Sequence, residues 1–193
     1  AHSFLHERSS DLSKRAAFLT RARPAVASWR AENDAGITSA LAGRGVDWTG
    51  GPSVAQPSVS AVFQAVEDGP AGNVPAATVS TAPLTAGASA TLTMSVTNNG
   101  DKPLFRVRCA SRSDNQQLDA REFLFGRIDP GATVTRTVRF KVPRETWQRR
   151  DRVELSLYQN VLDPLPGGQD VYVDFVPLPH PRFGFTYQVM DVG

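Results

Sequence analysis

The segment TLTMSVTNNGDKPLFRVRCA, residues 91–110, decides the fold class of this chain. In its first half, large apolar residues alternate with threonine or serine, at positions Leu92, Met94 and Val96. This two-residue period is typical of a β-strand with one buried face. The turn-forming residues 98–101 follow, and a second alternating run then completes the segment. The pattern predicts two strands joined by a tight hairpin turn.

The same period recurs on both sides of this segment, from about residue 56 to residue 178. Clear examples are the runs that contain Val138, Leu155 and Val173. Breakers rich in proline and glycine separate the runs at intervals of about 8 to 20 residues, which is typical of a sandwich. We therefore predict that residues 56–178 form an antiparallel immunoglobulin-like β-sandwich of about seven or eight strands.

A short helical segment is expected in front of the sandwich, over residues 1–47, because apolar residues recur there at three- and four-residue spacing. They form two stripes, one with Leu12, Ala16, Leu19 and Ala22, the other with Val26, Trp29, Ile37 and Leu41. Pro24 is expected to end one helix and begin another, and Gly43 or Gly45 suits the final C-terminus. Helices of this length are weak alone, so we expect them to dock on the sandwich or on another chain, or to fray.

Two further segments complete the predicted organisation. The composition of residues 48–55, rich in glycine, proline and serine, is that of a linker. Residues 179–193 begin with a proline-rich spacer and continue as a new alternating strand. This strand is expected to be the first of a missing domain.

Composition and charge exclude several classes of protein. Hydrophobic residues make up 40% of the chain and charged residues 21%, which is normal for a globular protein. The net charge is +2, with 21 basic and 19 acidic residues, so we expect no nucleic-acid partner. No apolar run reaches the roughly 18 to 20 residues of a membrane helix, so we expect no direct membrane insertion.

Candidate catalytic and metal-ligating residues do not form a recognisable pattern. The three histidines, His2, His6 and His180, do not provide a set of three or four metal ligands. The oxygen-rich segment 113–119 does not have the spacing of a calcium-binding EF-hand loop, which favours a solvated loop. No serine has the surroundings of an activated nucleophile, and Cys109 shares a strand face with apolar residues. We therefore expect no catalytic residue, cofactor or metal.

Basic side chains in two of the predicted strands form a candidate partner-binding surface: Arg106, Arg108, Arg112, Arg139 and Lys141. If they gather on one outer face of the sandwich, they would suit an acidic partner. Charges on strands also serve simply to keep a sheet soluble, and no aromatic residues interleave with these five, which argues against single-stranded nucleic acid.

Several segments resemble a known family. Residues 96–108 (VTNNGDKPLFRVR), 113–115 (SDN) and 118–131 (LDAREFLFGRIDPG) resemble a region near the C-terminus of large C-terminal-processing, or tail-specific, serine proteases of myxobacteria and related bacteria. Residues 45–48 (GVDW) resemble the junction between helix and sandwich in these proteins, and residues 185–191 (FTYQVMD) resemble the first strand of the following domain.

This resemblance implies an accessory role. Proteases of this family carry a PDZ domain and a Ser–Lys dyad upstream of this region, so no catalytic residue is transferred to this chain. Residues 1–47 would correspond to the last helices of the protease core, and residues 56–178 to an accessory module for substrate presentation, partner docking or spacing. The implied partners are the rest of the protease and protein substrates. The implied location is the periplasm, the outer envelope or the extracellular space.

Two alternatives remain beside this reading. The chain is a stand-alone extracellular protein-binding or adhesion module, or it is an enzyme in its own right. The first requires an exposed ligand surface, and the second requires a convergent cluster of polar side chains.

Overall fold

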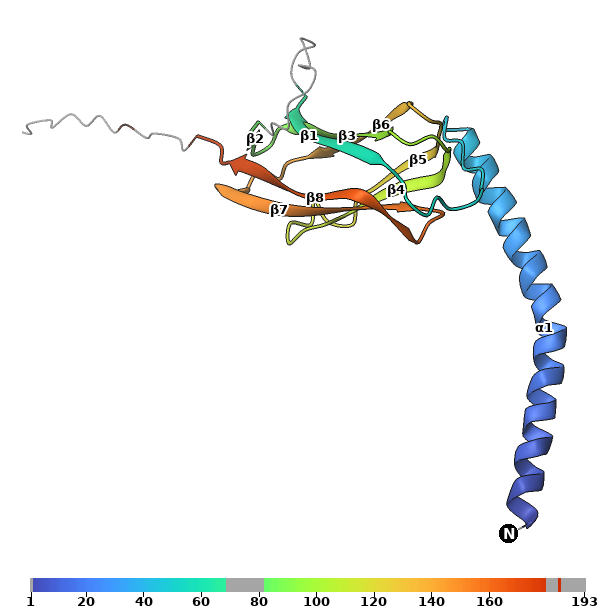
Figure 1. The fold of residues 1–193 in the computed structure, drawn as a ribbon. Helices are drawn as coiled ribbons and strands as arrows, with labels where there is room; N and C mark the ends of the chain where they lie inside the picture. The colour runs from blue at the N-terminus through green and yellow to red at the C-terminus, as the bar shows by residue number, and fades with distance from the viewer. Residues whose placement is uncertain (1, 69–81, 180–183, 185–193) are drawn as a thin grey trace, which may run out of the picture.

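The computed structural model describes residues 2–68, 82–179 and 184. It contains one helix and eight strands in two sheets (Figure 1). Their bounds are α1 His2–Ala42, β1 Val59–Glu67, β2 Leu84–Thr85, β3 Ser89–Asn98, β4 Leu104–Arg112, β5 Glu122–Ile128, β6 Thr133–Lys141, β7 Arg149–Gln159 and β8 Asp163–Val176. The strand expected at residues 185–191 lies outside the described residues.

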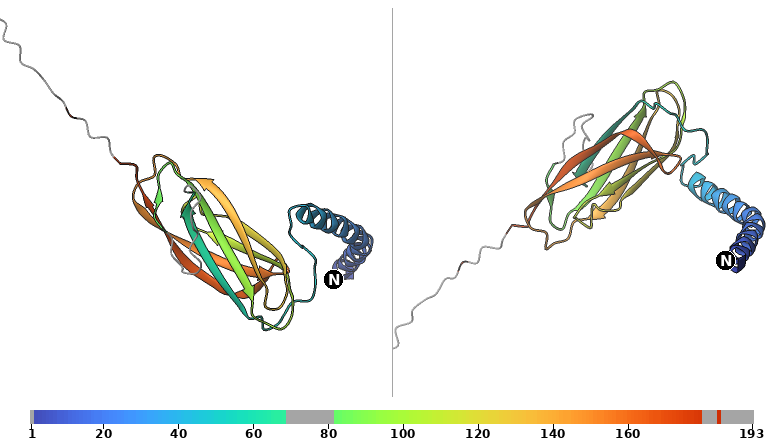
Figure 2. Two further views of the ribbon diagram at one scale, coloured as in Figure 1. Left: turned by 90° about the horizontal axis from the view of Figure 1, so that it is seen from above. Right: turned by 60° about the horizontal axis from the view of Figure 1, so that its bottom comes forward.

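The strands form a β-sandwich, which confirms the predicted fold class. One sheet has the order β1-β3-β6 and the other the order β2-β8-β7-β4-β5. Neighbouring strands are antiparallel except for β2, which pairs with β8 in parallel. Two packed antiparallel sheets with this interleaved strand order are characteristic of immunoglobulin-like domains. Figure 2 shows the two layers from two further directions.

The core lies between the two sheets and is built from the alternating residues. Phe63, Leu92, Met94, Leu155 and Val173 are all 2% exposed or less. Within each of the strands that carry them, the side chains next to a buried residue point outward. In β3, buried and partly exposed residues therefore alternate regularly. Burial of each such side chain contributes roughly 1.5 to 3 kcal/mol before chain entropy is subtracted.

The turn at residues 99–103 is an arch rather than the expected hairpin. β3 belongs to the three-stranded sheet and β4 to the five-stranded sheet, so the turn carries the chain from one layer to the other. The buried amide of Asn98 holds this arch together. Its Nδ2 donates to the carbonyl oxygens of Lys102 (2.8 Å) and Ile128 (3.0 Å), and its Oδ1 accepts from the amide of Gly100 (3.0 Å). The turn residues were recognised correctly, but their pattern does not show whether the two strands pair or face each other.

Helix α1 is continuous over 41 residues, with Pro24 inside it, so the expected break at this proline is wrong. The residues on both sides are mainly alanine, arginine and leucine, which are strong helix formers and offset the interruption. The helix extends away from one end of the sandwich (Figures 1 and 2). None of the helices in the described part of the chain is both long enough and apolar enough to cross a bilayer.

The C-terminus of α1 has a Schellman motif at Gly45, one of the two glycines expected to suit the end of the helix. Gly45 has a φ of +71°, its amide donates to Ala42 O, and the amide of Val46 donates to Leu41 O. The chain that follows packs on β5, where the amide of Arg127 donates to Asp47 O at 2.7 Å. Val46 and Trp48 are both buried there.

The predicted linker, residues 48–55, has no regular secondary structure but is bound to the sandwich. The side chain of Gln159 pairs with the backbone of Val54, donating from Nε2 to its carbonyl (2.8 Å) and accepting its amide at Oε1 (3.0 Å). Nδ2 of Asn160 donates to Gly51 O at 2.9 Å. These contacts fix the segment between α1 and β1 against the end of β7.

Cys109 lies in β4 and is completely buried, with no exposed surface. Burial raises the pKa of its thiol from 9.0 to about 12, against smaller opposing effects of the Ser156 backbone and Arg108. Folding raises this pKa because the folded protein favours the neutral thiol. The stabilisation that comes from burying the neutral thiol is therefore complete below pH 9 and is lost as the pH rises toward 12.

We expect native Cys109 to be almost inert toward iodoacetamide at about pH 8, because the thiolate is the reactive species and is roughly 1,000-fold scarcer than in the unfolded chain. Mass spectrometry of the protein alkylated with and without urea measures the two rates. Equal rates would contradict the burial of this thiol.

Candidate functional site

The five basic residues of the candidate partner-binding surface do not share one face. Arg106, Arg108 and Arg112 lie on β4 in the five-stranded sheet, whereas Arg139 and Lys141 lie on β6 in the three-stranded sheet. All five project away from the core, so the two groups point to opposite sides of the sandwich. The expectation of a single basic patch is therefore wrong, because the sequence period gives the inner and outer faces of each strand but not the sheet to which the strand belongs.

The two half-buried arginines of β4 are engaged within the protein. Arg106 forms an ion pair with Asp34 of α1 (2.5 Å), and its Nε donates to Trp48 O at 3.0 Å. Arg108 forms an ion pair with Glu122 at 3.2 Å and stacks over the ring of Tyr158, 4.5 Å from its centroid. These two arginines join parts of the fold. Arg112, Arg139 and Lys141 are exposed.

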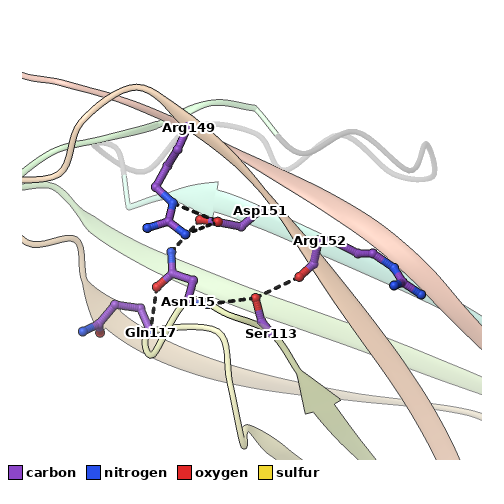
Figure 3. A network of polar contacts seen from close by, with 6 residues as sticks. All are labelled: Ser113, Asn115, Gln117, Arg149, Asp151 and Arg152. Atoms are coloured by element: carbon purple, nitrogen blue, oxygen red, sulfur yellow. Dashed lines mark hydrogen bonds and ion pairs between the residues drawn. The ribbon is translucent and has the colours of Figure 1, made fainter.

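At the end of the sandwich where β7 begins, the loop between β4 and β5 is held in a network of polar contacts (Figure 3). The buried carboxylate of Asp151 accepts from Nδ2 of Asn115 (2.7 Å) and from both Nε and Nη2 of Arg149. Oδ1 of Asn115 in turn accepts from the amide of Gln117 at 2.9 Å. Ser113 Oγ donates to Arg152 O at 2.8 Å, which ties the loop to β7.

Three residues of this network, Asn115, Gln117 and Arg149, line a cavity of about 390 Å³. The loop between β6 and β7 also contributes to the lining. The lining residues are Asp114, Asn115, Gln116, Gln117, Pro143, Glu145, Thr146, Trp147, Arg149 and Phe175. The indole of Trp147 is 72% exposed, and the lining contains two acidic residues and one basic residue. We refer to this cavity as the Trp147 pocket.

This pocket could not be predicted from the sequence, because its residues come from two loops, the start of β7 and the end of β8. Only segment 113–119 had been noticed, as a set of oxygen ligands. Its Asp119 accepts the amide of Ser113 (3.0 Å), and the nearby Glu122 and Asp129 form ion pairs with arginines. A tryptophan among polar residues in the connection 143–148 is the one signal that could have indicated the pocket.

The described residues contain no group of three or more His, Cys, Asp or Glu side chains that is placed to hold a metal ion. The side chains of His2 and His6, and the whole of His180, lie outside the part of the chain that the structure describes.

A second surface lies at the junction between α1 and the sandwich. A cavity of about 560 Å³ is lined there by Trp29, Arg30, Ala31, Asn33, Asp34, Ile37 and Arg106. Among the described side chains of the helix, five large apolar ones are exposed: Phe18 by 69%, Leu19 by 41%, Val26 by 45%, Trp29 by 64% and Ile37 by 51%. We call this set the apolar stripe of α1. The contact of Asp34 with Arg106 joins the helix to the sandwich at this junction.

The fold and these two surfaces define the chain as a helix-extended β-sandwich, and comparison with known proteins adds little to this description. No family model and no curated protein matches the sequence. Among solved structures, a family 123 glycoside hydrolase from Clostridium perfringens shares 12% identity over 63% of this chain and 27% of its own, with a TM-score of 0.40. The secreted serine protease VesC from Vibrio cholerae shares 17% identity over 49% of this chain and 21% of its own, with a TM-score of 0.28. Similarity at this level carries no information about function.

Proposed function

We propose that this chain is a non-catalytic accessory β-sandwich module of a secreted or envelope C-terminal-processing serine protease, and that it docks on the rest of that protease through α1. The observation that carries the proposal is the apolar stripe of α1, which is exposed along a helix whose base is fixed to the sandwich.

The apolar stripe of α1 exposes large side chains whose burial against a partner would be favourable. Each of its large side chains would contribute up to roughly 1.5 to 3 kcal/mol if a partner buried it fully. The contact of Asp34 with Arg106 and the burial of Val46 and Trp48 restrict the helix at its base. A helix restricted in this way loses less conformational freedom on binding.

The charge of the helix indicates the chemistry of the partner. Residues 14–30 contain five basic residues and no acidic residue. Two copies of this segment would repel each other when packed side by side. A partner surface with an apolar groove between acidic side chains would complement it.

The segments that resemble processing proteases also support the proposal. Residues 45–48 and 118–131 are far apart in the sequence, yet they contact each other through the hydrogen bond from the amide of Arg127 to Asp47 O. Two of the segments that carry the family resemblance therefore meet at the junction between helix and sandwich.

Replacement of both Trp29 and Ile37 by aspartate is expected to weaken binding to the separately expressed catalytic core of the protease by tenfold or more, because charge replaces the apolar contact. Analytical ultracentrifugation of the mixture measures the affinity. The melting temperature of the free chain is expected to stay within a few degrees of the wild type, since both side chains are mainly exposed.

The matched control is Trp147→Ala, which removes an exposed tryptophan at the other end of the sandwich and is expected to leave this affinity unchanged. A chain that binds an extracellular protein but no protease core would instead be a stand-alone binding module. Peptidase activity of the purified chain, abolished by a serine-directed inhibitor, would refute the non-catalytic role.

A further inference from the structure

We propose that the Trp147 pocket binds a neutral oligosaccharide, with a sugar ring stacked on the indole of Trp147 and its hydroxyl groups hydrogen-bonded to the side chains of the β4–β5 loop. This inference does not depend on the proposed protease partner, because it rests on a different surface.

One side of the pocket is held in place by hydrogen bonds within the protein. Asp151 is only 6% exposed, and its carboxylate holds both Asn115 and Arg149. Asn115 also fixes the loop through its own backbone, because its carbonyl accepts the amides of Leu118 and Asp119, both at 2.8 Å. A site whose side chains are already positioned loses little entropy when it binds a weakly interacting ligand.

Trp147 supplies the apolar part of such a site. Its indole is 72% exposed at the wall of the pocket, so it contributes little to the core. A flat aromatic ring with one free face fits the C–H face of a pyranose, which is the apolar side of a sugar. The side chains of Gln116 and Gln117 line the same pocket, and their amide groups offer both donors and acceptors to neighbouring hydroxyl groups.

The charge of the pocket argues against an anionic ligand. Asp114 and Glu145 are acidic, and the guanidinium of Arg149 is already paired with Asp151. The pocket therefore has no uncompensated positive charge for a phosphate, a sulfate or a terminal carboxylate. Neutral hydroxyl groups can donate to the two carboxylates and accept from the amides.

The fold also argues against an extended peptide at this place. β7 pairs with β8 on one side. On the other side its pairing with β4 ends at Glu154, and beyond that point the β4–β5 loop contacts β7 through Ser113 Oγ, which donates to Arg152 O at 2.8 Å. Little of this edge is therefore free for a peptide backbone. Of the other apolar residues of the lining, Phe175 is 1% exposed and Pro143 is partly buried, so Trp147 provides the main exposed apolar surface of the pocket.

The test titrates the purified chain with cellohexaose, chitohexaose and maltohexaose by isothermal titration calorimetry, up to millimolar concentration. We expect saturable binding of at least one of them, an affinity reduced by tenfold or more in Trp147→Ala, and an unchanged affinity in Trp29→Ala. Trp29 is the matched control because it is also a mainly exposed tryptophan, on α1. Unchanged melting of both variants shows that the fold is intact.

Three outcomes would overturn the inference. These are no binding of any of the three oligosaccharides, binding that Trp147→Ala leaves unchanged, and saturation of the pocket by heparin or by an unstructured peptide in place of the neutral sugars. The proposed docking of α1 is tested by Trp29 and Ile37, so either proposal can fail while the other holds.

Discussion

Replacement of Gly126 by alanine is expected to destabilise the protein by about 2 to 5 kcal/mol. Gly126 has a φ of +80°, which strains any residue with a side chain. An added Cβ would also lie 2.3 Å from Asp47 O, which belongs to the segment that packs on β5. The backbone of Asp47 must then move and expose Val46 and Trp48, which are buried on either side of it. Urea unfolding, monitored by tryptophan fluorescence, measures the change in the free energy of unfolding.

Gly131→Ala is the matched control for this experiment. Gly131 has a φ of +73°, but no atom lies within 4 Å of the position that its Cβ would take. Its replacement should cost only the backbone strain, about 1 kcal/mol. Similar losses in the two variants would mean that residues 46–48 do not pack on β5 in solution.

Asn98→Asp is expected to destabilise the protein by about 3 to 5 kcal/mol. The carboxylate has the shape of the amide but cannot donate, so the carbonyls of Lys102 and Ile128 would face a buried negative charge. Asn98 is 1% exposed, so water cannot replace the lost donors. Chemical denaturation gives the free energy of unfolding.

The adjacent Asn99 provides the control for the arch. Its side chain is exposed and donates only to Ser60 Oγ, at 3.1 Å. Asn99→Asp should therefore change the stability by about 0.5 to 1 kcal/mol. If Asn98→Asp were equally mild, the amide of Asn98 would not be what holds the two sheets together at this end.

The strands with strict alternation could be predicted from the sequence, because one face of each is buried. β3 is the clearest case, with Leu92, Met94 and Val96 directed into the core. β5 was not recognised, since Leu124 adds an apolar residue on its outer face and Gly126 interrupts the pattern. The region where α1 ends could also be predicted, because Gly43 and Gly45 are suitable terminators, and Gly45 has the left-handed conformation there.

Features that depend on which strands pair with each other could not be predicted from the alternation of apolar residues in the sequence. Whether residues 99–103 form a hairpin or an arch depends on which strands pair with β3, and the basic residues of β4 and β6 were separated for the same reason. In β4, a bulge with Arg106 at a φ of +47° interrupts the alternation, so that Leu104 is buried in the core and Phe105 is only partly buried. The Trp147 pocket combines two loops whose proximity no local pattern encodes.

Helix α1 is long and is attached to the sandwich near its C-terminal end, so a small rotation there moves its N-terminal end a long way. A helix of 41 residues extends about 60 Å. A rotation of about 10° at its base would therefore carry its N-terminal end through about 10 Å. The ion pair of Asp34 with Arg106 lies close to the pivot, so loosening this contact would change the reach and direction of the helix far more than it would change the sandwich.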